Sequence, residues 1–367
     1  MLIWWKLLVV SAGVQLLYYL LFARLNRVRP IRGLPEMPTP VSVVICARNE
    51  AKNLLKNLKV ILIQQHPQFE VIVVNDQSTD NTLDVLVDFY MRNKNLKIIN
   101  VANEEKKDLA GKKYALLKGI DAAVYEHVVV TDADCRPSST LWLAKLASCF
   151  GPNTDFVLGH APFYKQSGFL NKLARYENYM TALQSFGWAL NGVPYMGIGR
   201  NMAFRKSVIK GFDGFQKHPT LPTGDDDLLV NAKAGFNSTE VCIDKDAFMY
   251  SDTKPTFSEW LNQKRRHLRS GFHYKWWHQI LLFIFSFSSA AFYFSVGATA
   301  YFGTVPFWIW ALVATWILLR FAITYRMFTK LAVADLRLLW PVWDVCYLLY
   351  LVLIFFLLLL KPKNTWN

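Results

Sequence analysis

Apolar residues are distributed unevenly along this chain of 367 residues. They concentrate at the two ends, in four stretches: Leu2 to Ala23, Gln279 to Phe302, Thr304 to Tyr325 and Trp340 to Leu360. Each stretch has about 20 residues, which as a helix is long enough to cross the hydrocarbon core of a bilayer. The pattern therefore predicts one membrane helix before a globular middle region and three after it.

The first apolar stretch could instead be a secretory signal peptide. It lacks a clear small-residue cleavage site, however, and it is longer than the apolar core of a typical signal peptide. We therefore interpret it as a retained membrane anchor.

Basic residues beside the apolar stretches indicate their orientation, because Lys and Arg are enriched in cytoplasmic loops. Two basic groups follow the first stretch and precede the second: Arg24, Arg27, Arg29 and Arg32, and Lys264, Arg265, Arg266, Arg269 and Lys275. With four spans, the cytoplasmic side also receives Arg320, Arg326, Lys330 and Arg337, and the outside only Lys6, Lys361 and Lys363. We expect a multi-pass protein of the cell membrane with a cytoplasmic middle region.

Short β-branched runs alternate with helical patterns in the middle of the chain. The runs begin at Val41, Glu70, Leu96, His127 and Phe156, and helices are expected near Glu50, Asp80 and Lys112. This alternation is typical of a mostly parallel sheet covered by helices. A further helical period from Phe169 to Leu190 is compatible with packing either on the sheet or against the bilayer surface.

Composition and charge narrow the classes of function. Hydrophobic residues make up 53% of the chain, the mean hydropathy is +0.18 and the formal net charge is +14. Because much of this charge flanks the apolar stretches, we attribute it to anionic lipid headgroups rather than to nucleic acid, for which no motif is present. The cysteines form no CxxC pair and are assigned no metal and no disulfide, as is typical of a reduced compartment: Cys46, Cys135, Cys149, Cys242 and Cys346.

Polar residues follow three of the predicted strands. They are Arg48, Asn49 and Glu50 after the first strand, Asn75 and Asp76 after the second, and Thr131 to Asp134 after the fourth. Ligands bind beyond the carboxyl ends of the strands in open α/β sheets. We therefore expect these clusters to line one crevice.

Asp132 and Asp134, in the sequence VTDADC, form the main candidate metal site. Carboxylate oxygens at the mouth of a crevice suit Mg²⁺ or Mn²⁺, which bridge protein carboxylates to substrate phosphates. Turns are also rich in Asp, so an Asp-x-Asp pair alone is a weak signal.

Asp76 and Lys112 are candidates for contacts with a nucleotide donor. Asp76 can accept hydrogen bonds from a base, since Ser78 or Asp80 can cap the helix that follows. Lys112 begins a helix, where a positive charge and backbone N–H groups attract an anion. Surface solvation is the plain alternative for Lys112, and Lys113 competes for the same role.

An acidic run and a basic run follow later in the chain. Asp225, Asp226 and Asp227 repel one another unless a cation or a proton relieves them, so one could serve as a general base. A solvated acidic turn is the alternative. The arginines of QKRRH could stabilise a leaving diphosphate, although positive charge is also expected beside a membrane span. The segment GIGRNM is not a GxGxxG motif, and we interpret it as a tight turn near the acceptor side.

Taken in order, ICARNE, VVNDQSTDN, GKKYAL, TDADC, GIGRNMAF, GDDDLLV and QKRRH resemble the motif series of family 2 glycosyltransferases. The resemblance covers roughly Val41 to Lys275. It implies a GT-A fold, Rossmann-like α/β with a mostly parallel sheet, as a cytoplasmic domain with one N-terminal and about three C-terminal transmembrane helices. The implied domains are an anchor at 1–24, a catalytic domain at 38–258, an interfacial basic segment at 259–278 and transmembrane helices at 279–360.

The resemblance also implies roles for individual residues. The base and ribose of the donor would contact Ala47, Arg48, Glu50 and Asp76, and the donor would also contact Lys112. Asp132 and Asp134 would hold its diphosphate and the Mg²⁺ or Mn²⁺ ion. Asp226 matches the catalytic base of the family's Glu-Asp motif, with Asp225 in place of the Glu. Gln263 and Arg266 match the Gln-x-x-Arg-Trp motif and, with Arg265, would bind the donor.

The function implied is an inverting transfer of a sugar, a hexose in the simplest case, from a nucleoside diphosphate, with UDP preferred. The acceptor would be a membrane-associated lipid or glycan, in glycolipid or cell-surface polysaccharide synthesis. His267 stands where the motif usually has Trp, and processive synthases of the family need more spans. We therefore expect single additions, as in the similar ceramide glucosyltransferases and bacterial lipid glycosyltransferases.

Other classes of protein explain fewer of these motifs. A processive polysaccharide synthase and a noncatalytic membrane scaffold are the main alternatives. A nucleotidyltransferase would not explain GDDDLLV followed by QKRRH. A transporter is disfavoured because the apolar stretches carry few charges, Asp344 being the main exception, and Asp344 could lie near an interface.

Overall fold

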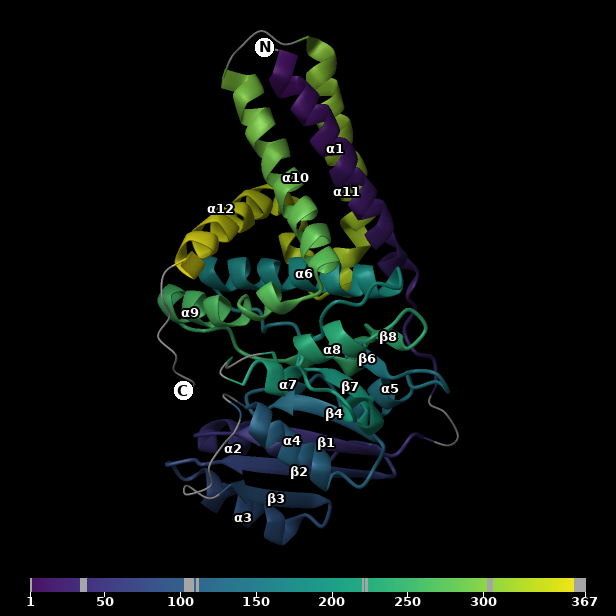
Figure 1. Cartoon of the computed structure of the whole chain (residues 1–367), viewed down its shortest axis with the longest axis vertical. Coiled ribbons are helices and arrows are strands. Elements are labelled where there is room, and N and C mark those ends of the chain that lie inside the picture. The colour runs from purple at the N-terminus through teal and green to yellow at the C-terminus, as the bar shows by residue number, and fades with distance from the viewer. Residues whose placement is uncertain are drawn as a thin grey trace.

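A globular α/β domain lies below a group of long apolar helices (Figure 1). The computed structural model describes residues 2–33, 38–101, 109, 112–219, 221, 224–301 and 306–359. The predicted span ends Phe302, Thr304 and Leu360, and the basic residues Lys361 and Lys363, lie outside these ranges.

The sheet has seven strands in the order β3-β2-β1-β4-β7-β6-β8. The five predicted runs all form strands: β1 (Val41–Ala47), β2 (Phe69–Asp76), β3 (Leu96–Val101), β4 (His127–Asp132) and β6 (Phe156–Gly159). Strands β1 to β4 are parallel, as predicted. The sequence analysis missed β7 (Met202–Arg205), which pairs antiparallel with β4 and β6, and β8 (Thr239–Cys242). A separate antiparallel pair joins β5 (Arg136–Pro137) to β9 (Met249–Tyr250).

Helices cover both faces of the parallel strands, because successive side chains of a strand point to opposite faces. Val43 and Ile45 belong to a buried cluster with α2 (Ala51–Leu62) and α3 (Thr82–Arg92). Val44 belongs to the other cluster, with α4 (Lys113–Ala122). A Cβ on Gly119 would come within 2.5 Å of Val44, so glycine permits the close approach of α4 to the sheet. The short α5 (Trp142–Ala147) follows β5.

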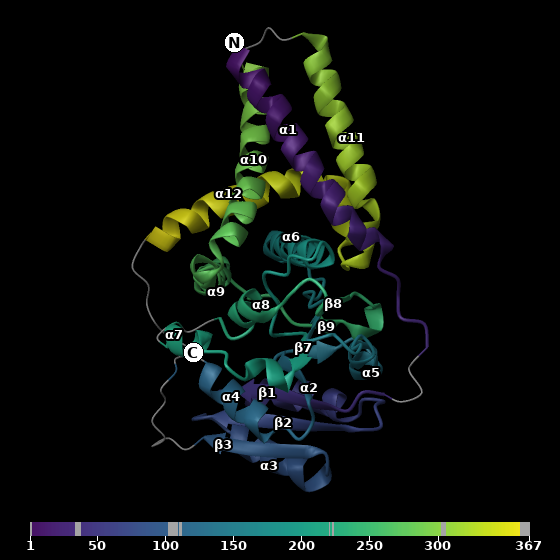
Figure 2. The ribbon, with the colours of Figure 1, turned by 45° about the vertical axis from the view of Figure 1, so that its right-hand side comes forward.

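Within the described ranges, four helices are long and apolar enough to cross a membrane, and they coincide with the four predicted stretches. They are α1 (Leu2–Phe22), α10 (Trp276–Tyr301), α11 (Phe307–Lys330) and α12 (Trp340–Leu359). Helices α1, α10 and α11 extend away from the sheet together, whereas α12 lies across their base (Figures 1 and 2). The end of α1, the start of α10 and the end of α11 all lie on the side of the globular domain (Figure 1). The basic residues at these ends include Arg24, Lys275 and Lys330.

The remaining elements are shorter and connect these parts. They are α7 (Gly214–Lys217), α8 (Asp227–Lys233), α9 (Phe257–His267), η1 (Ala23–Arg27), η2 (Lys206–Ile209), η3 (Lys245–Ala247), η4 (Ser270–His273) and η5 (Ala334–Leu339).

Helix α6 (Phe169–Leu190) lies between the sheet and the apolar helices (Figure 2). The sequence left open whether this helix packs on the sheet or faces the bilayer. It does neither alone, because most of its side chains are buried on both sides. The Arg175 guanidinium pairs with the Asp335 carboxylate at 2.6 Å, and the Tyr176 hydroxyl donates to Asp344 of α12 at 2.6 Å. Helix α6 therefore connects the globular domain to the membrane helices.

Asp344, in the second turn of α12, is buried inside the protein at 2% exposure. Its carboxylate forms an ion pair with Arg320 of α11 and accepts a hydrogen bond from Tyr293 of α10 at 2.9 Å. The Arg320 guanidinium also lies 4.1 Å from the ring centroid of Trp340. The pair therefore fastens α11 to α12.

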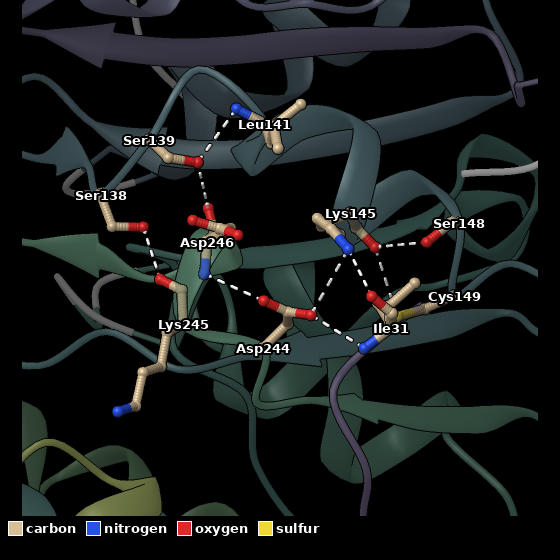
Figure 3. A network of polar contacts seen from close by, with 10 residues as sticks. All are labelled: Ile31, Ser138, Ser139, Leu141, Lys145, Ser148, Cys149, Asp244, Lys245 and Asp246. Carbon is tan, nitrogen blue, oxygen red and sulfur yellow. Dashed lines mark hydrogen bonds and ion pairs between the residues drawn. The ribbon is translucent and has the colours of Figure 1, made fainter. Parts of the chain in front are cut away.

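The segment after the first membrane helix is fastened to the globular domain by a polar network (Figure 3). The Ile31 N–H donates to the Asp244 carboxylate at 2.8 Å, and the Ile31 carbonyl accepts from Lys145 of α5. The Lys145 ammonium lies 3.7 Å from the Asp244 carboxylate. These contacts fix where the chain from α1 approaches β1.

Candidate active site

The loops that follow β1, β2 and β4 lie at one edge of the sheet. Ala47 is the register partner of Asn75 in the parallel pair of β1 and β2. Cys46 is the partner of Asp132 in the pair of β1 and β4. Since parallel strands end at the same edge, the structure brings together the three polar clusters that the sequence indicated.

Arg48 and Glu50 belong to a loop whose shape is set by hydrogen bonds to the loop after β2. Between them, Asn49 has a φ of 58°, a conformation that its short polar side chain tolerates. The Asn49 N–H donates to the Ser78 hydroxyl at 3.0 Å, and its side-chain oxygen accepts from the Thr79 N–H at 2.8 Å. The two loops therefore form one firm rim beside the end of the sheet.

Asp76 is completely buried at the end of β2. The next helix does not depend on its carboxylate, because Asp80 accepts from the Thr82 N–H and hydroxyl at 3.0 and 2.5 Å. Asp80 thus serves the start of α3, one of the two options that the sequence offered. Ser78, the other option, contacts Asn49 instead.

Asp132 and Asp134 form a cluster with Cys135, in which one possible ligand atom of each lies within 4.8 Å of the others. Carboxylate oxygens fit Mg²⁺ or Mn²⁺, whereas sulfur is a soft ligand, and the Cys135 thiol donates to Asp134 at 3.3 Å. Burial and the charge of Asp132 raise the pKa of Asp134. A divalent cation would relieve that repulsion, so the residues present fit such an ion.

Lys112 joins this pair to the acidic run. Its ammonium lies 2.9 Å from the Asp132 carboxylate and 2.9 Å from the Asp225 carboxylate. Burial acts to lower the pKa of Lys112, but Asp132, Asp225 and Asp226 hold it well above its ordinary value. A permanent positive charge therefore lies between the candidate metal ligands and the candidate base.

Lys113 is placed differently from Lys112. It is fully buried, and its ammonium donates to the carbonyls of His218 and Leu221 at 3.1 and 2.9 Å. The structure therefore assigns the position beside the carboxylates to Lys112 and gives Lys113 a bracing position.

Asp226 precedes α8 and caps it. One carboxylate oxygen accepts from the Asp227 N–H at 2.8 Å, and the other accepts from the Gly199 N–H. Burial, followed by the charges of Asp225 and Asp227, raises the pKa of Asp226 to about 7, although Lys112 acts in the opposite direction. A carboxylate with a pKa near neutrality can take a proton from a hydroxyl group.

Helix α9 presents Gln263, Arg266 and His267 on one side, because positions three and four apart share a helix face. Burial lowers the pKa of Arg266, while the nearby charges of Asp132 and Asp225 oppose that effect. Arg266 thus belongs to the same site. Arg265, two positions from Gln263, is offset from this face.

The orientation of α9 depends on two contacts with distant helices. Lys264 forms an ion pair with Glu177 of α6, and the two side chains are only 12% and 9% exposed. The ring centroid of Trp260 lies 4.7 Å from the ring centroid of Tyr350 on α12. Lys264 was interpreted from the sequence as a flanking positive charge, and the structure shows that it also fixes α9 to α6.

Arg200 is a site residue to which the sequence analysis gave no role. It lies in the turn at GIGRNM, where its guanidinium donates to the Ser251 hydroxyl at 2.6 Å and lies 4.5 Å from the Phe163 ring centroid. Burial acts to raise the pKa of Asp132 and Asp134, and the charge of Arg200 acts against it. The only signal in the sequence was one positive charge beside a glycine, which is unspecific.

Comparisons with known proteins identify similar sequences for the globular part of the chain. Residues 42–212 match the family model described as glycosyl transferase family 2. A poly-beta-1,6-N-acetyl-D-glucosamine synthase of Staphylococcus epidermidis is 29% identical over 192 residues, 50% of this chain and 44% of that protein. A probable glycosyltransferase of Bacillus subtilis is 28% identical over 207 residues, 54% of this chain and 47% of that protein. The chain thus spans less than half the length of these relatives.

A solved structure extends the comparison to nearly the whole chain. It is a mannosyltransferase from Pyrobaculum calidifontis in complex with GDP-Man and Mn²⁺, with a TM-score of 0.57 and 20% sequence identity. The match covers 93% of this chain and 97% of the other. It shows a shared fold of the GT-A type, which this chain builds from a mostly parallel sheet and from apolar helices before and after it. The family match therefore identifies residues 42–212 of this chain as a glycosyl transferase family 2 domain.

Proposed function

We propose that this chain is an inverting glycosyltransferase that moves a sugar, a hexose, from a nucleoside-diphosphate donor to a membrane lipid or lipid-linked acceptor. UDP is the preferred nucleotide. The observation that carries the proposal is the position of Lys112, whose ammonium contacts both Asp132 and Asp225. Two sets of carboxylates with different tasks therefore meet in one site.

A divalent ion on Asp132 and Asp134, Mg²⁺ or Mn²⁺, would neutralise the donor diphosphate. Lys112 and Arg266 add positive charge where the diphosphate departs. Asp226 removes the proton from the acceptor hydroxyl as the hydroxyl oxygen attacks the anomeric carbon. The bond from that carbon to the phosphate oxygen breaks, the nucleoside diphosphate leaves, and the configuration inverts. On the other side of the site, Ala47, Arg48, Glu50 and Asp76 hold the base and ribose.

The proposed arrangement in the membrane keeps the boundaries given by the sequence. The anchor is 1–24, the catalytic domain 38–258, the interfacial segment 259–278 and the membrane helices 279–360. The catalytic domain would be cytoplasmic, in line with the basic residues at its end of the helices. A protease site inserted in the loop at Asn237 would test this orientation. A protease added to intact cells should leave it uncut, and the same protease added to inverted membrane vesicles should cut it.

The first test is release of nucleotide from a panel of UDP and GDP sugars by the full chain in nanodiscs. GDP sugars are included because the solved mannosyltransferase structure contains GDP-Man. We expect release to require Mg²⁺ or Mn²⁺ and to be lost in Asp226→Asn, whose carboxamide cannot take the proton. Near-normal transfer by that variant would remove Asp226 as the base. No release from any donor would favour a noncatalytic scaffold.

A processive polysaccharide synthase is the second candidate, favoured by the name of the Staphylococcus epidermidis relative. The two functions differ in product length. Single addition predicts one sugar per acceptor at every donor concentration, measured by mass spectrometry of the extracted product. A ladder of products would establish the processive alternative.

A further inference from the structure

Asp227 is the third carboxylate of the acidic run. Its contacts differ from those of Asp225 and Asp226. One of its oxygens accepts hydrogen bonds from the Ser270 hydroxyl and from the Tyr274 hydroxyl, the latter at 2.7 Å. The other accepts from the Leu228 N–H at 2.8 Å. Asp227 therefore joins the start of α8 to the residues between α9 and α10.

Asn231 repeats this connection one helical turn later, where a position four residues on shares a helix face. Its side-chain oxygen accepts from the Lys275 N–H at 2.9 Å. Its amide nitrogen donates to the Tyr195 carbonyl at 2.9 Å and lies 2.9 Å from a ring nitrogen of His278. Asp227 and Asn231 together thus contact four residues within 270–278, the segment that leads into α10.

We propose that Asp227 is a positioning residue which, with Asn231, latches the helix behind Asp226 to the entry of the first C-terminal membrane helix. The inference rests on the proposed function, in which Asp226 is the base. The latch holds Asp226 at a fixed place relative to Arg266, because α9 and residues 270–278 are consecutive.

The negative charge of Asp227, and not only its hydrogen bonds, is part of the proposed role. Asparagine could accept the same two hydroxyl donors, and burying a third carboxylate beside two others is unfavourable. The charge of Asp227 also acts on Asp226, which is faced by Asp225, Asp227, Lys112 and the Gly199 N–H. Burial raises the pKa of Asp227, whereas the hydrogen bonds from Ser270 and Tyr274 lower it. The charge of Asp227 also interacts with Asp225, Lys113 and Tyr195.

The test compares three variants of the full chain in nanodiscs, each assayed for kcat against pH and for donor KM. Asp227→Asn removes the charge but keeps an acceptor for the hydroxyls. Tyr274→Phe removes a donor but keeps the charge. Asp244→Asn is the matched control, since it changes a buried, hydrogen-bonded carboxylate in the network of Figure 3, away from the site.

We expect Asp227→Asn to move the acidic limb of the kcat profile to lower pH by about half a unit or more, because Asp226 loses a negative neighbour. Tyr274→Phe should lower kcat about tenfold through misplacement of the base and leave the limb in place. Donor KM should stay within about twofold in both, since the proposed contacts to the base, the ribose and the metal lie on the loops after the strands. Asp244→Asn should change neither the limb nor kcat.

Two results would overturn the latch. One is a wild-type profile and kcat in both Asp227→Asn and Tyr274→Phe. The other is an equal loss of kcat in all three variants with no shift of the limb, which would mean that only general stability was changed. Failure of the proposed function is distinguishable, since the wild-type chain would then release no nucleotide from any donor.

Discussion

Two halves of the site are held together in different ways. The sheet half comprises residues 46–50, 75–82 and 131–135, and its loops are fastened to one another, as Asn49 is to Ser78 and Thr79. The helix half comprises residues 225–231 and 257–278, and it depends on side chains of other helices, such as Glu177 of α6 and Tyr350 of α12. The sheet half is therefore held by contacts within the globular domain, whereas the helix half also depends on contacts with α6 and α12.

The largest effect is expected in the sheet half, from Asp132→Asn. The amide replaces a charged oxygen of the candidate metal site, so kcat/KM should fall about 10³-fold, or about 4 kcal/mol. Initial rates during Mn²⁺ titration measure it. Stability should change little, because the Asp132 side chain is 34% exposed and Lys112 keeps its ion pair with Asp225. A near-normal rate at saturating Mn²⁺ would show that the site lies elsewhere.

In the helix half, Glu177→Gln should leave the Lys264 charge buried and unpaired. Such a loss costs about 3 kcal/mol of stability. Thermal unfolding of the chain in detergent measures it, and donor binding to the sheet half should persist. The double variant Glu177→Leu with Lys264→Met serves as control and should regain most of the stability. Equal stability of the single variant and the wild type would mean that this pair does not hold α9.

The contact between the halves is tested by Lys112→Met. Loss of the ammonium that joins Asp132 to Asp225 should lower kcat/KM about 10²-fold, or about 2.7 kcal/mol. Lys113→Met is the neighbouring control, and it should lower the melting temperature through the lost bonds to His218 and Leu221. A greater loss of turnover in the folded Lys113 variant would reverse the two assignments.

The smallest effect concerns the pH dependence of the helix half. In the proposed mechanism Asp226 acts as a base when it is deprotonated, and its pKa is raised to about 7. Activity should therefore be present above that pH and fall tenfold, or about 1.4 kcal/mol, for each unit below it. The profile of kcat against pH at saturating donor measures this limb. An acidic limb near pH 4 instead would point to an unperturbed carboxyl group.

The contrast between the halves also explains what could be predicted from the sequence. The β-branched runs and the polar residues after them predicted β1 to β4 and the edge at which Asp76 and Asp132 lie, because parallel strands impose that geometry. Strand β7 was missed, since MAFR is too short to carry a clear alternation. The periodicity of apolar residues predicted that α6 is a helix. It could not show that α6 is buried on two sides, because the sheet and the apolar helices that cover it are formed by distant parts of the sequence.

The helix half was less accessible for the same reason. Lys264 has the charge of a membrane flank, and only the fold shows Glu177 beside it. Three consecutive aspartates signal mutual repulsion, but nothing local separates Asp227, which bonds Ser270 and Tyr274, from Asp225, which pairs with Lys112. Long-range side-chain partners decide each of these roles.

The ion pair between Arg320 and Asp344 has a consequence for biogenesis. A lone arginine near the middle of an apolar helix costs about 3 kcal/mol during insertion by the translocon. Its partner lies 24 residues later in the chain, on the next helix. Helix α11 is thus poorly suited to leave the translocon alone, and it should partition into lipid together with α12 as a helical hairpin.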